Sequence, residues 1–169
     1  MLQRLRPGAW ALCLACVGAE SSACSSSERA APPEIWVDLG RSGGPDGLDF
    51  EHLESGGSVP LYTFGQGGTH ALLAVRCSGL GDRAFVAITI RNPEDGRSVT
   101  APAGASPRLL ACDGAGVCDL VPLLVMTGGL VAPGVDRDGL AVVIQADASN
   151  LAGISASVAR EAFLSTASL

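Results

Sequence analysis

Along several short runs of this chain, apolar residues alternate with polar or small ones, and this period of two constrains the fold more than any other feature. The clearest run covers residues 85–91. Within it Val86, Ile88 and Ile90 fall on one side of an extended chain, and the residues between them fall on the other. Because successive side chains of a strand point to opposite faces, the run predicts a half-buried strand.

Clusters rich in Gly, Pro, Asn and Asp separate this run from others. We expect strands at residues 34–39, 58–64, 69–77, 85–91, 98–101, 108–112, 119–126, 140–147 and 154–159. Pro60 favours an edge position for its strand, since proline cannot donate a hydrogen bond to a neighbour. The last run is rich in Ala and also fits a helix, but its alternation favours a strand. Short strands at a spacing of roughly 8–12 residues, without amphipathic helices between them, predict an all-β sandwich or barrel.

The C-terminal third narrows this expectation. An Asp-x-Asp-Gly turn at residues 136–139 precedes an alternating run, Asp147, a Gly-containing turn and a final run. This order resembles the last hairpin of many bacterial immunoglobulin-like domains, over about thirty residues. Those domains often carry Tyr where Leu140 and Ala141 stand here, so the corner hydrogen bond of that tyrosine is missing. The resemblance implies an antiparallel immunoglobulin-like sandwich of about 7–8 strands.

Residues 1–19 have the composition of a signal segment. Two arginines and no acid precede the uncharged apolar stretch 8–19, which is too short to span a bilayer. Residues 20–33 are rich in Ser and end in two prolines, a composition typical of a flexible tether. A buried first helix is the alternative, and the Ser/Pro stretch directly after it disfavours that reading. We therefore expect an exported protein whose folded domain covers residues 34–169.

Three processing sites are open. Residues 14–16 (Leu-Ala-Cys) resemble the lipobox of bacterial lipoproteins, in which the Cys, here Cys16, is lipidated and becomes N-terminal. That family usually has an aliphatic residue where Cys13 stands here. Residues 17–19 suit ordinary signal peptidase, and Cys24 in Ser-Ala-Cys is a third option. Lipidation of Cys16 would place the protein in the periplasm, at the outer membrane or on the cell surface, whereas cleavage after Ala19 would release it.

Cysteine parity argues against processing at Cys24, and of the other two sites we favour Cys16. Its lipidation, or cleavage after Ala19, leaves an even set of cysteines suited to disulfides in an oxidising compartment: Cys24, Cys77, Cys112 and Cys118. Cys112 and Cys118 flank a short Gly-containing turn, so we expect a disulfide across that hairpin. Cys77 then pairs with Cys24 or replaces one hairpin partner. The connectivity stays open, because spacing does not determine it.

The charge balance restricts the partners. The chain has 11 basic residues against 17 acidic ones, a net charge of −6, and removal of the signal segment makes it more acidic. Without a basic patch, binding to nucleic acid or to anionic lipid headgroups is not expected. Aromatic residues make up only 4% of the chain, so stacking platforms for bases or sugars are not expected either. Membrane attachment would come only from a lipid anchor.

Asp136 and Asp138 have the spacing of carboxylates in a calcium loop. Aligned to that loop, however, Gly134 occupies the first ligand position, and Gln145 occupies the last, where a bidentate Glu is needed. A turn that caps a strand is therefore the favoured interpretation. A calcium-dependent adhesion module is the alternative.

The two histidines, His52 and His70, have no His or Cys partner at zinc-ligand spacing. No Gly-x-Ser-x-Gly motif marks a nucleophile, and the Gly-rich residues 65–68 lack the Lys of a phosphate loop. We expect no metal and no cofactor. The favoured function is a non-enzymatic exported or membrane-tethered domain for binding or structural display, with an envelope or extracellular partner. A small secreted hydrolase using His70 or His52 is the alternative.

Overall fold

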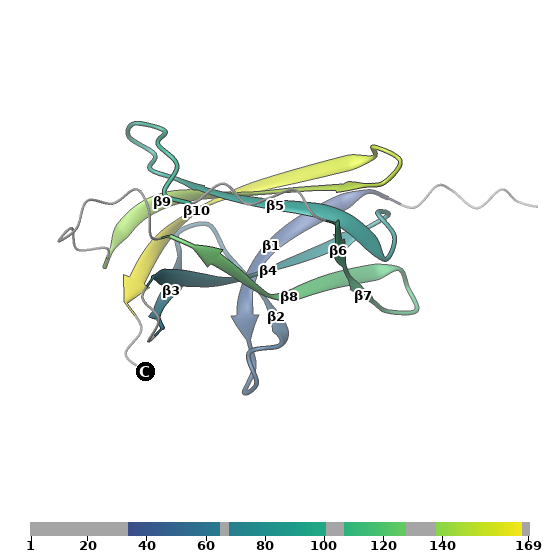
Figure 1. The fold of residues 1–169 in the computed structure, drawn as a ribbon, viewed down its shortest axis with the longest axis horizontal. Coiled ribbons are helices and arrows are strands. Elements are labelled where there is room, and N and C mark those ends of the chain that lie inside the picture. The colour runs from purple at the N-terminus through teal and green to yellow at the C-terminus, as the bar shows by residue number, and fades with distance from the viewer. Residues whose placement is uncertain (1–33, 65–67, 101–106, 128–137, 167–169) are drawn as a thin grey trace, which may run out of the picture. The chain divides into compact units, whose positions relative to one another are not determined.

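A computed structural model describes residues 34–64, 68–100, 107–127 and 138–166, all of which lie in one compact unit. Strands and turns make up these residues, without a helix among them, so the all-β prediction is confirmed (Figure 1). The strands are β1 (Trp36–Gly43), β2 (Asp49–His52), β3 (Gly57–Thr63), β4 (Thr69–Ser78), β5 (Arg83–Arg91), β6 (Pro107–Leu109), β7 (Ala111–Cys112), β8 (Val117–Met126), β9 (Leu140–Asn150) and β10 (Ser155–Thr166).

The strands form one curled sheet, so that β5, β9 and β10 lie over β1, β4 and β8 (Figure 1). In the first of these layers, β9 is paired with β5 on one side and β10 on the other. In the second, β4 is paired with β1 and β8, while β2 pairs with β1 and β7 pairs with β8. Strand β3 joins the layers, because it pairs with both β4 and β10.

The expectation of a purely antiparallel sheet is wrong. β3 and β10 run parallel, whereas every other strand pair is antiparallel. A parallel pair needs a long connection, and almost the whole domain separates these two strands in the sequence. Pro60 lies in this pair, opposite Ser165. Strand β3 is also paired with β4, from Leu61 onward, so the edge position that Pro60 favoured for its strand is wrong.

Alternating side chains of the facing strands fill the space between the layers. Ile88 and Ile90 of β5 are buried while Ala87 and Arg91 are exposed, which confirms the alternation predicted for this run. The largest fully buried side chains are Leu39, Leu53, Leu73, Ile90, Ile144, Leu164, Val59, Val75, Val142, Thr127, Cys77 and Cys118. Full burial of one Leu, Ile or Val side chain contributes about 1.5–3 kcal/mol.

The structure differs from the sequence-based prediction at three places. The first strand was expected at residues 34–39, but β1 continues to Gly43 and pairs with β2, a strand that the sequence pattern did not predict. Residues 98–101 were expected to form a hairpin strand, and among the described residues of this stretch, 98–100, only a single bridge occurs, between Arg91 and Ser98. The expected strand at 108–112 is divided, since β6 pairs with β5 and β7 with β8.

Candidate binding face

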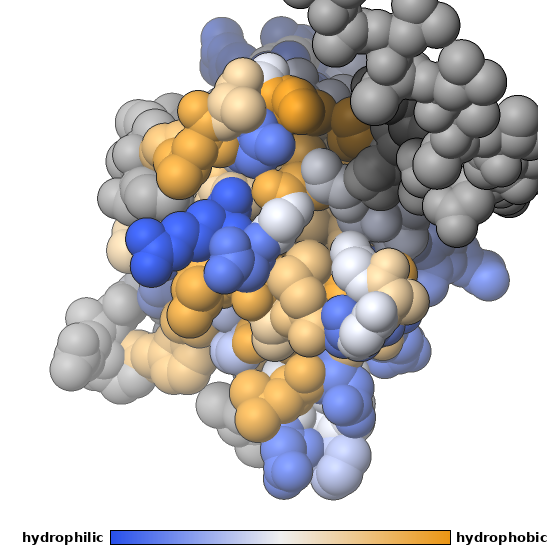
Figure 2. Space-filling view, turned by 90° about the vertical axis from the view of Figure 1, so that its right-hand side faces the viewer, coloured by the Kyte–Doolittle hydropathy of each residue, from blue (hydrophilic) through white to orange (hydrophobic). Residues whose placement is uncertain are grey.

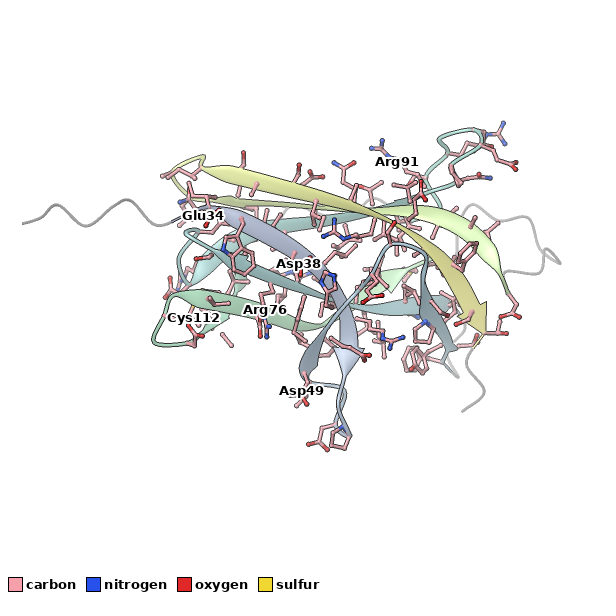
Figure 3. The ribbon with its side chains drawn as sticks, turned by 180° about the vertical axis from the view of Figure 1, so that it is seen from behind. Glu34, Asp38, Asp49, Arg76, Arg91 and Cys112 are labelled. Carbon is pink, nitrogen blue, oxygen red and sulfur yellow. A yellow bond between two sulfur atoms is a disulfide. The ribbon has the colours of Figure 1, made fainter. Side chains whose placement is uncertain are left out.

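The outer face of β1, β4 and β8 carries a row of charged side chains. The strand register places Asp38 of β1 opposite Arg76 of β4, and Arg76 opposite Asp119 of β8. Directly opposite residues in an antiparallel pair point to the same face. Nε and Nη2 of Arg76 donate to the two carboxylate oxygens of Asp119, both at 2.8 Å (Figure 3). This bidentate hydrogen bonding raises the pKa of Arg76 and holds its guanidinium in one orientation.

An aromatic ring covers the guanidinium. The guanidinium carbon of Arg76 lies 4.4 Å from the ring centroid of Phe50, which belongs to β2. The ring rests against Gly40 of β1, where a Cβ atom would come within 2.6 Å of a Phe50 ring carbon. Gly40 therefore leaves the space in which Phe50 lies against the sheet. Arg76 is held by an ion pair and a cation–π contact together.

Strand β2, which carries Phe50, is fixed by a second ion pair. Arg41 of β1 hydrogen-bonds to the carboxylate of Glu51, and this bond lowers the pKa of Glu51. The guanidinium of Arg41 also donates to the backbone carbonyl of Ser58, at 3.3 Å. One side chain thus joins β1 to both β2 and β3.

The carboxylate of Asp38 connects three strands. His52 of β2 lies with Nδ1 2.7 Å from Oδ2 of Asp38, and Nη2 of Arg160 from β10 lies 3.3 Å from Oδ1. An Asp–His pair orients an imidazole as a general base would require. A hydrolase also needs a nucleophile on the other ring nitrogen. No Ser, Thr or Cys hydroxyl or thiol within the described ranges hydrogen-bonds to His52.

His70 lies apart from this pair, at the start of β4. Its ring meets the edge of Phe64 with 5.2 Å between centroids. Its Nδ1 atom is buried and has no hydrogen-bond partner among the described residues. His52 therefore has a carboxylate partner, Asp38, whereas His70 has an aromatic partner, Phe64.

Next to the charged row, the same face becomes apolar. Leu124 and Met126 of β8 are 54% and 51% exposed, and they stand opposite Leu72 and His70 of β4. Phe64, in contact with His70, is 41% exposed. We call the set of Asp38, Phe50, Phe64, His70, Leu72, Arg76, Asp119, Leu124 and Met126 the outer face. It combines an oriented charged group with exposed apolar side chains farther along the same two strands.

Exposed apolar residues also occur elsewhere. Figure 2 looks onto the end of the molecule that holds the β7–β8 and β9–β10 turns, where apolar and hydrophilic residues are interspersed. Leu151 in the β9–β10 turn is 66% exposed. Single exposed apolar residues are ordinary on protein surfaces. The outer face differs because its exposed apolar residues adjoin across paired strands.

Of the two carboxylates of the calcium candidate, the structure describes only Asp138. Oδ1 of Asp138 accepts hydrogen bonds from the backbone N–H and the hydroxyl of Thr166, at 2.8 and 3.2 Å. Asp138 thus ties the start of β9 to the end of β10. Asp136 lies outside the described residues. Within the part of the chain that the structure describes, no group of His, Cys, Asp and Glu could hold a metal ion.

A disulfide joins Cys112 of β7 to Cys118 of β8, with 3.9 Å between their Cα atoms. Cys77 of β4 is a free, fully buried thiol, and burial raises its pKa to about 11. The lipidation candidate Cys16 and the alternative Cys24 lie outside the described residues.

No sequence pattern identifies Asp38, Phe50, Arg76 and Asp119 as a group. They come from four strands, and only the register brings them together. The local signal that exists is an isolated Arg within an apolar run, at residue 76. In a half-buried strand such a residue marks the solvent face, but it does not reveal its neighbours.

Comparison of the chain with protein-family models, with curated proteins and with solved structures found no match. In the described ranges, no helix is long and apolar enough to cross a membrane.

Proposed function

We propose that this chain is an exported, non-enzymatic domain, tethered to the cell envelope through lipidated Cys16, that binds a protein partner through the outer face. The tether part rests on the sequence: a basic, then apolar signal segment, a lipobox-like tripeptide, and a Ser/Pro-rich spacer. Two or three acyl chains on one Cys would anchor the domain stably, which a single chain would not.

The observation that carries the binding part is the fixed guanidinium of Arg76 on the same face of the sheet as exposed apolar side chains. Arg and Met are enriched in protein interfaces, and an Arg that is already oriented loses less side-chain entropy on binding. Arg76 is held by Asp119 and Phe50 before any partner arrives. Leu124 and Met126 supply apolar area farther along the same face, opposite Leu72 and His70 of β4.

We further propose that the curled sheet is an immunoglobulin-like sandwich. In that fold one sheet has the strand order A-B-E-D and the other has C, F and G side by side, with F in the middle. Here the order β1-β4-β8-β7 matches A-B-E-D, and β9 between β5 and β10 matches F between C and G. The parallel β3–β10 pair would be an additional A-side strand alongside G. On this assignment the outer face is the solvent face of the A-B-E-D sheet.

A photo-crosslinking residue tests the binding face. It replaces Leu124 on the outer face in one variant and Leu151 in the β9–β10 turn in the other, since both leucines are more than half exposed. Each variant is irradiated in its native envelope. We expect a discrete cross-linked protein from position 124 and none from position 151. Equal cross-linking at both positions, or none at either, contradicts the proposed face.

The tether is tested by Cys16→Ser. This substitution removes the only sulfur to which the lipobox reading attaches lipid. We expect the wild-type protein in the membrane fraction and loss of the lipid from the variant. Cys24→Ser is the matched control, because it removes a nearby cysteine and should leave the lipid in place. Lipid that persists in Cys16→Ser but not in Cys24→Ser would assign the anchor to Cys24.

The Asp38–His52 pair favours one second candidate, a small hydrolase in which His52 is the base. In this function the nucleophile would be a water molecule or a group of the bound substrate, and His52 would take its proton. His52→Gln would abolish any hydrolysis of chromogenic ester or peptide substrates by the purified protein. Activity that is equal in the wild type and in His52→Gln would remove this candidate.

A further inference from the structure

Three cysteines lie in one row across three neighbouring strands. Cys77 of β4 is the register partner of Cys118 of β8, and Cys118 is the register partner of Cys112 of β7. Cys118 is thus flanked by a cysteine on each side. At present it forms a disulfide with Cys112, and Cys77 is the free thiol.

The positions of Cys77 and Cys118 are also suited to a disulfide between these two residues. Both residues belong to the buried core, with 0% and 2% exposure, so their side chains point into the same space. Directly opposite residues in an antiparallel pair have Cα atoms about 4.5–5.5 Å apart. Disulfides join Cα atoms at roughly 4.4–6.8 Å. A Cys77–Cys118 bond therefore requires no rearrangement of the β4–β8 pair.

We propose that Cys77 and Cys118 form an alternative disulfide by internal exchange, which turns Cys112 into an exposed, reactive thiol. The Cys77 thiol loses its proton to solvent, and the resulting thiolate attacks Sγ of Cys118. A bond forms between Cys77 and Cys118 as the Cys118–Cys112 bond breaks. Cys112 leaves as a thiolate and takes up a proton. The number of disulfides is unchanged, so the exchange needs no external oxidant or reductant.

The order of the three strands also determines the direction from which Cys77 attacks Cys118. A thiolate displaces the leaving sulfur most readily along the line of the bond that breaks. Cys77 approaches Cys118 from β4, on the side opposite to β7, which carries the leaving Cys112. Because β4 and β8 are held together by pairing along most of their length, the attacking and attacked residues stay adjacent without binding any partner.

The exchange changes where the free thiol is found. Cys77 is buried in the core, while Cys112 lies on the exposed two-residue strand β7 (Figure 3). Burial raises the pKa of the Cys77 thiol, so little of the attacking thiolate is present at neutral pH and the exchange is slow. After exchange, Cys112 is available for a mixed disulfide with an external thiol-containing molecule. This site is independent of the lipid tether and of the outer face.

The test uses the full chain with Cys13, Cys16 and Cys24 changed to Ser, so that only the three cysteines of the row remain. The folded, oxidised protein is incubated with iodoacetamide and then cleaved without reduction for peptide mass mapping. We expect alkylated Cys112 to accumulate together with a peptide pair linked through Cys77 and Cys118. Alkylation confined to Cys77, with the Cys112–Cys118 pair intact, overturns the proposal.

Two substitutions complete the test. Cys77→Ala in the same background removes the attacking thiol, so alkylation of Cys112 should fall to zero. Cys112→Ser leaves only Cys77 and Cys118, which should become linked in the folded protein under air; two thiols that stay reduced contradict the proposed geometry. The unsubstituted protein is mapped as well. A Cys24–Cys77 linked peptide there overturns the proposal, because Cys77 would then not be free.

Discussion

The guanidinium of Arg76 lies on the ring of Phe50, with 4.4 Å between its carbon and the ring centroid, although the two residues come from different strands. The stack depends on β2 folding onto β1, since Phe50 belongs to β2 and lies against Gly40 of β1. The same guanidinium is bound by Asp119 of β8. Arg76 thus links β2, on one side of β4, to β8 on the other side.

Arg76→Lys should lower the free energy of unfolding by about 1 kcal/mol, because an ammonium can neither bind Asp119 in a bidentate manner nor stack on Phe50 in the same way. Chemical denaturation followed by fluorescence measures this change. Arg97→Lys is the control, since the Arg97 side chain is 85% exposed and pairs with Asp95 only at 3.5 Å. If the two substitutions have equal effects, the stack and the ion pair contribute nothing specific.

Gly40→Ala should destabilise the domain by about 1–3 kcal/mol. A Cβ atom at residue 40 would lie 2.5 Å from the backbone oxygen of Glu51, so β2 must move away from β1. Gly114→Ala is the matched control, because nothing lies within 4 Å of a Cβ there. Thermal unfolding compares the two. A Gly40→Ala variant as stable as Gly114→Ala would show that β2 does not pack closely on β1.

The titration of Cys77 should be displaced upward in the folded protein. Burial raises its pKa from 9.0 to about 11, so the folded state keeps a proton that the unfolded state loses. The stabilisation linked to this proton is complete below pH 9 and is lost as the pH rises towards 11. The titration uses a Cys112→Ser/Cys118→Ser variant, in which Cys77 cannot exchange, and the difference in ultraviolet thiolate absorption between it and the same variant with Cys77→Ala gives the midpoint. A midpoint near 9 in the folded protein would mean that the thiol reaches solvent.

Asp138→Ala should lower the melting temperature equally with and without millimolar calcium. The carboxylate accepts hydrogen bonds from the backbone and hydroxyl of Thr166, and their loss costs about 1–2 kcal/mol. A calcium-dependent adhesion module makes the opposite prediction: calcium raises the melting temperature of the wild type, and Asp138→Ala removes the rise. Scanning calorimetry in calcium and in a chelator distinguishes the two.

The sequence predicted those strands whose own residues alternate. β5 and β9 bury one face each, and the period of two identifies such strands without knowledge of their neighbours. The disulfide between Cys112 and Cys118 was also predictable from local sequence, because a short turn separates the two residues. The strand β2 was not, since it has four residues and none is buried.

Pairing between strands that lie far apart in the sequence cannot be predicted from local sequence patterns. The parallel pairing of β3 with β10 joins residues such as Ser58 and Ser165, which are 107 positions apart and share a hydrogen bond. The row of Asp38, Arg76 and Asp119 depends on the register of two strand pairs. A shift of one residue in either pair would send these side chains to opposite faces, and the alternation pattern alone does not determine which partner residue stands opposite which.

The intact mass of the mature protein, purified from its native membrane fraction and measured before and after reduction, shows whether the domain is exported on a lipid tether. We expect a chain that begins at Cys16 and carries the added mass of acyl chains. Reduction should add the mass of two hydrogens for the disulfide between Cys112 and Cys118. A chain that begins at Glu20 without lipid, or one that retains Met1, would contradict the tether.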